Sequence, residues 1–352
     1  MISPPALRNV LAGAALVLTA IASAVIAAGC GGGSSADTRY RAMSTVSTRP
    51  DIRVDKVTGG RHSLQAEAAL AEERTHNPGP ASDLERLHPR QFDKPVAEYR
   101  VYSEGQARQV QGAVDRLRAA LAAGDAAAAK AAWFDAYDHY LRLGAAYGAL
   151  GRLDEEIDGN PGRLPGGAHS PEFTGLHRIE MGLWEGEAPA RLLAPADYLA
   201  AKVRRLQVAV RRIPISPLVY ATRAHEILED AQRDMLSGVD APWSGAGLRA
   251  TFDSLAATEV VIGTLRPLLD GRDSTIEPVE VEMARFREVL ERVRKGAGGD
   301  WPRLEAMTPA QHERVDGALG SLLERLDAVP GALEVKRTRP VPTIAEQKRD
   351  AG

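Results

Sequence analysis

Residues 96–125 read VAEYRVYSEGQARQVQGAVDRLRAALAAGD, and this stretch decides the fold class. Its bulky apolar residues recur at the spacing of one face of an α-helix. Gly124 then breaks the pattern, and Asp125 is a residue type that caps the start of a following helix. The apolar positions of this first helix are Tyr99, Val110, Val114, Leu117 and Leu121.

The rest of the chain repeats this alternation of long helical patterns and short breaks. It contains no runs of alternating β-branched residues, the pattern of a strand. Short breaks between amphipathic helices imply antiparallel neighbours, so the sequence predicts an all-α fold of two packed helical-bundle halves. A long loop rich in Gly, Pro and Asp is expected at residues 154–170. Further helices are expected at about 125–150, 174–184, 195–212, 216–236, 245–270, 277–295 and 308–328.

The N-terminal segment predicts the location of the protein. Residues 10–28 are apolar apart from small residues, and they lead to Ala27-Ala28-Gly29-Cys30 and a Gly/Ser run. About 20 apolar residues can span a bilayer, so length alone also allows a transmembrane anchor. The small residues before the lone cysteine favour a processed signal, and they resemble a lipobox with Ala27 where leucine is more usual. We expect lipidation of Cys30, which would tether an exported domain to the membrane, facing the periplasm or the cell exterior.

Composition divides the chain into four parts. Residues 1–29 are the predicted signal peptide, and residues 30–95 are a lipidated tether and poorly ordered lead-in, rich in Ser, Thr, Arg, Gly and Pro. The helical domain is predicted to span residues 96–328. Residues 329–352 are charged and contain proline, so they predict a flexible tail.

Charge and cysteine content exclude several classes of function. The formal net charge is −3 over 352 residues, which argues against nucleic acid as the main partner, because phosphate binding needs a concentrated basic surface. A single cysteine can form neither an intrachain disulfide nor a cysteine-based zinc cluster.

The segment Phe173-Thr-Gly-Leu-His-Arg-Ile-Glu180 carries the clearest chemical signal. On a helix, His177 and Glu180 are three residues apart and share a face. An imidazole nitrogen and a carboxylate on one face can bind a transition metal. The alternative is a structural pair in which Glu180 only orients His177, because His-x-x-Glu is frequent by chance.

This Gly-x-His-x-x-Glu segment resembles the signature of the imelysin-like family, and the nearest branch looks like the EfeO/EfeM iron-uptake lipoproteins. The resemblance covers about residues 96–328. It also rests on four other segments, Glu98-Tyr-Arg-x-Tyr102, Ala122-Ala-Gly-Asp125, Leu153-Asp-x-x-Ile-Asp158 and Leu265-Arg-Pro-Leu-Leu269.

The resemblance implies a helical protein of two bundle-like halves that binds metal outside the cytoplasm. In that branch iron is captured and passed to a membrane permease with associated uptake proteins, so the implied ion is iron, with copper or zinc as alternatives. The wider family was catalogued as a peptidase. This chain lacks His-Glu-x-x-His, the metallopeptidase pattern that places two histidines and a glutamate on one helix, so we do not expect an enzyme.

Further ligands are needed, because two donors on one helix make a weak site. Asp154 and Asp158 match the family pattern and are the candidate additional carboxylates, although aspartates in such loops often only cap turns. His225 with Glu229, and Asp135 with His139, are also four apart, and we interpret both pairs as solvated or capping pairs.

The chain departs from the family pattern at several polar positions. A glutamate position is occupied by Gly144, and a His- and Asp-bearing segment reads Ser244-Gly-Ala-Gly-Leu-Arg-Ala250. Two hypotheses therefore remain. The chain is either a tethered metal-binding protein of iron uptake that uses His177 and Glu180, or a divergent scaffold that has lost metal binding and acts as a cell-surface interaction module.

Overall fold

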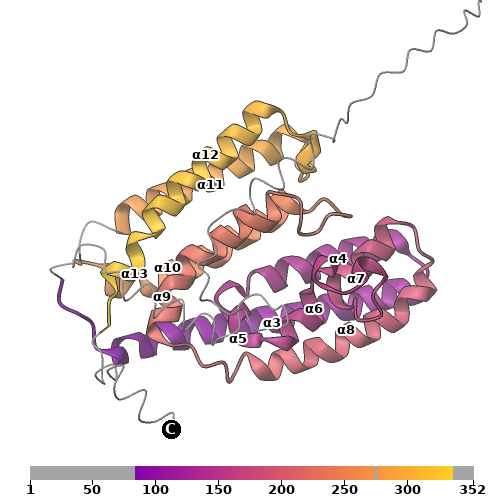
Figure 1. Ribbon diagram of the computed structural model, residues 1–352, viewed down its shortest axis with the longest axis horizontal. Coiled ribbons are helices and arrows are strands. Elements are labelled where there is room, and N and C mark those ends of the chain that lie inside the picture. Colours follow the sequence, from indigo (N-terminus) through magenta and orange to yellow (C-terminus); the bar gives the residue numbers. More distant parts are fainter. Residues whose placement is uncertain (1–83, 273–275, 336–352) are drawn as a thin grey trace, which may run out of the picture. The chain divides into compact units, whose positions relative to one another are not determined.

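The first long helix organises the N-terminal half of the fold. The structure, a computed structural model, describes residues 84–272 and 276–335, all within the unit Val57–Gly352 (Figure 1). Helix α3 spans Asp93–Ala122 and buries the predicted apolar face, including Tyr99 and Leu117. Asp125 caps the next helix as predicted, since its carboxylate accepts a hydrogen bond from the Ala128 backbone N–H at 2.9 Å.

Four helices pack as the N-terminal bundle. Helix α3 lies along both α4 and α8, and α7 packs against α4 and α8 (Figure 1). The short helix α6 closes one side by contacting α7 and α8. The bounds are α4 Ala126–Leu141, α6 Arg152–Asp158, α7 Gly175–Trp184 and α8 Pro189–Ala209.

The second helix ends earlier than the sequence pattern predicts. A helix was expected to continue to Leu150, but α4 ends at Leu141 and is followed by η2 (Gly144–Ala146) and α5 (Tyr147–Leu150). The cause is tertiary. A Cβ at Gly144 would lie 2.8 Å from the Ala257 Cβ, so this turn packs directly against a later helix.

The predicted loop at 154–170 is partly helical, and that prediction was wrong at its start. Leu153 and Ile157 are four residues apart, lie on one face of helix α6 and are both buried. Burial of this apolar face stabilises the helix, although the residues between them in the sequence are acidic. The remainder of the segment contains two short 3-10 turns, η3 (Pro161–Arg163) and η4 (Gly167–His169).

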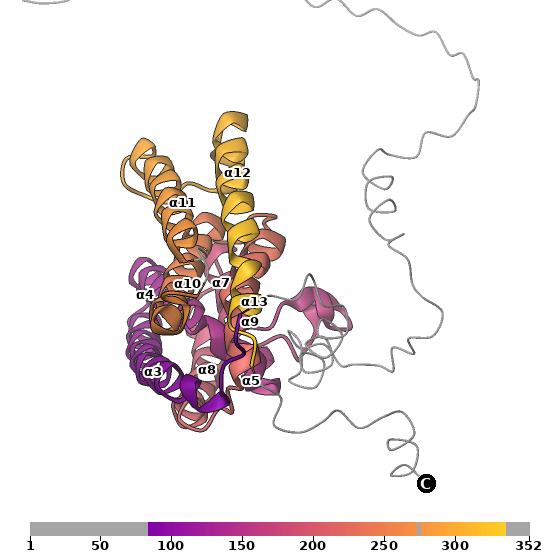
Figure 2. The same ribbon diagram turned by 90° about the vertical axis from the view of Figure 1, so that its left-hand side faces the viewer.

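The remaining helices form the C-terminal bundle. Helix α10 packs against α9 and α11, α11 lies along α12, and α12 and α13 both contact α9 (Figure 2). Helix α10 also contacts α3 and α4, and thereby joins the two halves. The bounds are α9 Pro217–Asp230, the π-helical η5 Ala231–Met235, α10 Gly247–Leu269, α11 Ile276–Gly296, η6 Leu304–Ala306, α12 Pro309–Leu326 and α13 Ala328–Ala332.

The all-α prediction with two packed bundle halves is confirmed. The described residues form helices, and their one β feature is the isolated bridge between Leu87 and Val335. This bridge, with the 3-10 turn η1 (Pro89–Phe92), extends the folded part beyond the predicted limits of 96 and 328. The predicted signal peptide, Cys30 and most of the predicted tail lie outside the described residues.

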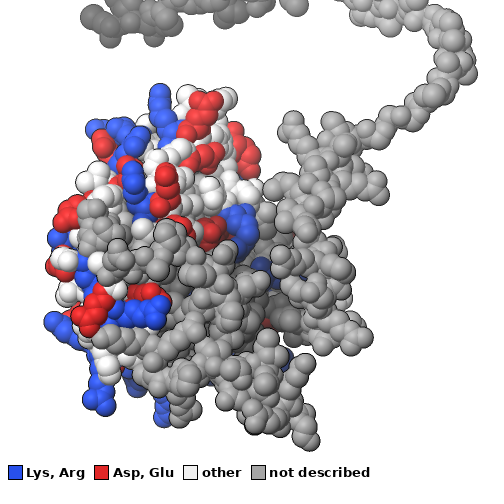
Figure 3. All heavy atoms as spheres, turned by 60° about the vertical axis from the view of Figure 1, so that its left-hand side comes forward, with Lys and Arg blue, Asp and Glu red and all other residues white. Residues whose placement is uncertain are grey.

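The hydropathy of the helices and the charge of the surface both bear on what the protein could contact. None of the helices in residues 84–272 and 276–335 is long and apolar enough to cross a membrane. On the face shown in Figure 3, acidic and basic side chains are interspersed over the described residues. This pattern agrees with the net charge of −3.

Candidate metal centre

Gly175 sets the position of the helix that carries the motif. Its backbone has φ +84°, a conformation that favours glycine, and a Cβ there would lie 2.3 Å from the Ile157 carbonyl oxygen. Helix α7 can therefore begin in contact with the end of α6. This close approach places His177 beside Asp158.

His177 and Glu180 form the predicted pair on one face of α7. The His177 Nδ1 lies 2.8 Å from the Glu180 Oε2. Both residues are buried, with 1% and 0% of their surface exposed. A buried carboxylate on Nδ1 fixes the orientation of the ring and directs Nε2 to the opposite side.

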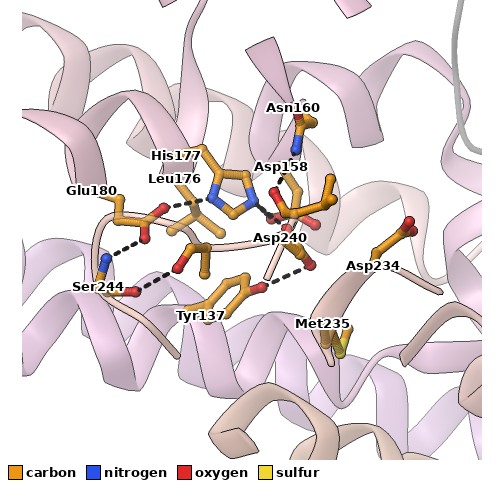
Figure 4. Close-up of polar contacts among 12 residues, drawn as sticks. Tyr137, Asp158, Asn160, Leu176, His177, Glu180, Asp234, Met235, Asp240 and Ser244 are labelled. Atoms are coloured by element: carbon orange, nitrogen blue, oxygen red, sulfur yellow. Dashed lines mark hydrogen bonds and ion pairs between the residues drawn. The ribbon is translucent and has the colours of Figure 1, made fainter. Parts of the chain in front are cut away.

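Two aspartates from different segments face that opposite side (Figure 4). The His177 Nε2 lies 3.2 Å from the Asp158 Oδ1 and 3.0 Å from the Asp240 Oδ1. The Asp240 Oδ2 accepts a hydrogen bond from the Tyr137 hydroxyl of α4 at 2.9 Å. Three carboxylates thus surround one imidazole in the core of the N-terminal bundle.

Asp240 was not predicted as a site residue. It lies in the irregular segment 236–246 between η5 and α10, far in sequence from His177. The available signal was weak: an aspartate between Val239 and Ala241, two residues after Gly238. No helical or strand periodicity links such a residue to a distant motif.

The same segment also contacts Glu180. The Ser244 backbone N–H donates to the Glu180 Oε1 at 2.7 Å, so both oxygens of this carboxylate are engaged (Figure 4). Segment 236–246 therefore supplies one carboxylate to the cluster and holds another in place.

Asp154 has a different setting. It lies one helical turn before Asp158 on α6, and its Oδ1 accepts a hydrogen bond from the Tyr140 hydroxyl. It is 5% exposed. The contacts that define the cluster around the imidazole come from Asp158, Glu180 and Asp240.

The carboxylates change the acidity of the imidazole. Burial opposes the charged form of His177, but the charge of Asp240 and hydrogen bonds to Asp158, Asp240 and Glu180 outweigh it and raise the pKa of His177 well above its usual range. These contacts therefore favour the protonated form of His177.

The other candidate pairs have partners at the surface or on neighbouring helices. His225 lies 3.2 Å from Glu229, whose side chain is 41% exposed. Asp135 pairs with Arg116 at 3.0 Å, while the His139 Nδ1 lies 2.9 Å from the Gln106 Oε1. His225 is therefore largely buried beside a more exposed Glu229, while Asp135 and His139 each bind another residue.

The positions that depart from the family pattern leave little room for larger residues. A Cβ at Gly245, where φ is +70°, would lie 2.6 Å from the Arg303 Cζ. A Cβ at Gly247 would lie 2.4 Å from the Met235 carbonyl oxygen. Ala250 is buried. These glycines therefore allow close packing around segment 236–246.

The cluster as it stands is held by hydrogen bonds and ion pairs. Within residues 84–272 and 276–335, no group of three or more His, Cys, Asp or Glu side chains is arranged so that it could hold a metal ion. Loading an ion between the His177 Nε2 and the two aspartates would require the imidazole to lose its proton and the carboxylates to converge.

Known proteins resemble this chain over the same helical region. It is 25% identical over 240 residues to "Iron uptake system component EfeO" of Yersinia pseudotuberculosis, covering 68% of this chain and 64% of that protein. The protein of the same name from Escherichia coli is 23% identical over 239 residues, covering 68% and 63%. The chain thus spans a little under two thirds of the length of these relatives.

A family model extends the comparison beyond pairwise similarity. The model described as imelysin, which carries a peptidase name, matches residues 95–329, well over half of the chain. The matched region includes α3 from its third residue, the elements that follow up to α12, and every residue of the His177 cluster. The chain belongs to the imelysin family.

Proposed function

We propose that this protein is the extracytoplasmic metal-binding component of an iron uptake system, and that it binds its ion at the His177 cluster. The observation that carries the proposal is the convergence of metal-ligand side chains. Asp158, Glu180 and Asp240 each bring a carboxylate oxygen within 3.2 Å of a single buried imidazole. Imidazole and carboxylate are side-chain donors that a transition metal takes from proteins.

The donor set suits a transition metal. Imidazole and carboxylate are both ligands that iron accepts, and zinc and copper also bind imidazole. Adjacent donors around an ion bound at about 2.1 Å lie roughly 3.0–3.4 Å apart. The distances from the His177 Nε2 to the two aspartate oxygens, 3.2 and 3.0 Å, are in this range.

Each residue has a role in this proposal. The His177 Nε2, Asp158 and Asp240 are the ligands, and water supplies any remaining position. The Glu180 carboxylate accepts a hydrogen bond from the Nδ1–H of His177. This bond fixes the tautomer that presents the Nε2 lone pair to the ion. Tyr137 orients Asp240 through its hydroxyl. Asp154 is not one of the proposed ligands. It holds α6 in place by accepting a hydrogen bond from the Tyr140 hydroxyl.

Iron is the proposed cargo because of the relatives. Both quoted relatives are named as iron uptake components, and the matched region contains the whole cluster. A binding role needs no turnover, and the proposed ligands lack the His-Glu-x-x-His pattern of metallopeptidases. We therefore propose a carrier rather than a peptidase.

The N-terminal sequence supports a tethered location. Cleavage before Cys30 and lipidation of its thiol would leave residues 31–83 as a long connection to the domain. Such a tether would allow the domain to reach a membrane permease and pass on its ion. Labelling with a radioactive fatty acid tests the anchor, because a Cys30→Ala variant would lose the label.

Calorimetric titration of the purified protein tests the site. Fe(II) without oxygen, Fe(III)-citrate, Cu(II) and Zn(II) are titrated into the wild type and into His177→Ala. We expect stoichiometric binding of iron that the substitution abolishes, while His225→Ala, outside the cluster, binds as the wild type does. Absence of heat with every ion, from a folded protein, would contradict the proposal and favour a scaffold without metal.

A further inference from the structure

The His177 cluster is closed to solvent, so an element has to move before an ion can enter or leave. Asp158 and Asp240 are each 3% exposed, and the histidine and glutamate are more deeply buried. Asp158, His177 and Glu180 lie on α6 and α7, which pack against each other and against α8. Asp240 and Ser244 lie instead on the irregular segment 236–246.

Segment 236–246 is held on its inner side by the buried Ala241 and Ala246 and by the bonds of Asp240 and Ser244, and on its outer side by hydrogen bonds at the surface. The Asn160 side-chain amide donates to the Val239 carbonyl oxygen at 3.1 Å. The Trp243 indole N–H donates to Glu185 at 3.2 Å. Because hydrogen bonds near solvent can be exchanged for bonds to water, these contacts are easier to open than the helix packing on the other side of the cluster.

Arg303 makes two of these contacts and comes from the C-terminal half of the chain. Its guanidinium donates to the Trp243 carbonyl oxygen at 3.0 Å and to the Pro242 carbonyl oxygen at 3.1 Å. The same side chain lies against Gly245, where a Cβ would be 2.6 Å from Cζ. Arg303 thus contacts the segment between Asp240 and Ser244, the two residues that reach the cluster.

The backbone of the segment favours release once these contacts open. Ala241 has φ +49°, in the left-handed region that a residue with a side chain adopts only when its surroundings hold it there. It lies directly between Asp240 and the carbonyl groups that Arg303 binds. Loss of the Arg303 contacts would remove one restraint on Ala241. It would thereby make it easier for Asp240 to leave the His177 ring, although the Tyr137 hydroxyl and the Asp234 carbonyl oxygen also bind Asp240.

We infer that Arg303 is a positioning residue that holds segment 236–246 closed over the His177 cluster and so sets the rate at which metal enters and leaves. This inference rests on the proposed metal site. Arg303 touches no proposed ligand and acts through the backbone of Pro242 and Trp243.

The first measurement is hydrogen exchange by mass spectrometry on the metal-free full-length protein. Arg303→Ala is expected to raise exchange at least about tenfold in peptides covering 236–246, including the Ser244 N–H, because each charge-assisted hydrogen bond contributes on the order of tenfold to an equilibrium. Exchange in α7 is expected to stay unchanged. Glu305→Ala is the matched control, because it removes only the 3.5 Å surface ion pair of Arg303.

The second measurement follows Co(II), used as a coloured probe ion. EDTA is added to the loaded protein and the loss of Co(II) absorption is timed. Arg303→Ala is expected to release Co(II) about tenfold faster, in proportion to the opening of the segment, with an unchanged visible spectrum because the ligands remain. Arg303→Lys keeps the charge and is expected to restore part of the slow release.

The outcomes separate this inference from the proposed function. Exchange and release at wild-type rates in Arg303→Ala would overturn it. Exchange could instead increase as much in α7 and α8 as in segment 236–246, and to the same extent in Arg303→Lys. That result would also overturn the inference, because it would show that Arg303 stabilises the fold in general. If the wild type binds no Co(II) or iron, the proposed function fails, and the exchange comparison alone decides whether Arg303 holds the segment.

Discussion

Two polar networks meet α4 at neighbouring positions, and they differ in the side chains that face their carboxylates. Tyr137 contacts the His177 cluster, in which three carboxylates face one imidazole. One residue later, Asp138 receives hydrogen bonds from Arg249 of α10, the shortest at 2.6 Å. Arg142, directly after the end of α4, donates to Asp253 of α10 at 2.8 Å.

The second network pairs guanidinium groups with carboxylates. Two arginines face two aspartates, and the bonds join α4 of one bundle to α10 of the other. Burial and the charge of Asp138 raise the pKa of Asp253, while Arg142 lowers it. A guanidinium group has no lone pair to offer an ion, whereas an imidazole and carboxylates do. We therefore propose a cation for the His177 cluster alone, and a role in joining the bundles for the arginine network.

The largest expected effect comes from the glycine that brings the cluster together. Gly175→Ala would place a Cβ 2.3 Å from the Ile157 carbonyl oxygen at φ +84°. We expect a loss of about 3 kcal/mol or more of unfolding free energy, together with loss of metal binding, measured by urea denaturation and titration. Gly263→Ala, in open space on α10, is the control and should stabilise by about 0.5–1 kcal/mol.

Asp240→Asn tests the His177 cluster without changing its shape. We expect metal affinity to fall by about 100-fold or more, since a charged ligand is replaced by a neutral one. The unfolding free energy without metal should also fall, by about 1–3 kcal/mol, because the charge of Asp240 is the main interaction that favours the protonated form of His177. Wild-type affinity would show that Asp240 is not a ligand.

Asp253→Asn is the matching experiment in the arginine network. It leaves Arg142 without its charged partner, so we expect a loss of about 1–3 kcal/mol of unfolding free energy. Metal affinity should remain that of the wild type. If metal affinity fell as far as in Asp240→Asn, the arginine network would also contribute to metal binding, and the proposed difference between the two networks would be wrong.

The smallest expected effect is on pH dependence. The folded-state pKa of His177 is raised, so its contribution to the stability of the metal-free protein is complete below about pH 6.5 and is lost as pH rises through the folded value. Because of His177, the unfolding free energy should fall by at most about 1.4 kcal/mol for each unit by which the pH rises. Urea denaturation between pH 6 and 9 should show this slope in the wild type and not in His177→Asn.

Metal binding should have the opposite dependence on pH. The ion competes with the proton on Nε2, so affinity is expected to increase as pH rises. A constant affinity over the same interval would mean that the ion does not displace the His177 proton.

The sequence predicted the features that are local. The apolar face of α3 and the pairing of His177 with Glu180 follow from helical periodicity. Asp158 could be proposed because it precedes the motif closely. Asp240 could not, because its contact with His177 depends on how segment 236–246 packs, and the break at Gly144 likewise depends on α10, which lies far along the chain.

Anomalous diffraction from iron-loaded crystals tests the central claim most directly, because it locates the ion without assumptions about its ligands. We predict one strong peak bonded by the His177 Nε2, Asp158 and Asp240, with Glu180 on the Nδ1 side of the ring. An iron peak elsewhere, with the ring of His177 still hydrogen-bonded to its three carboxylates as in Figure 4, would contradict the account.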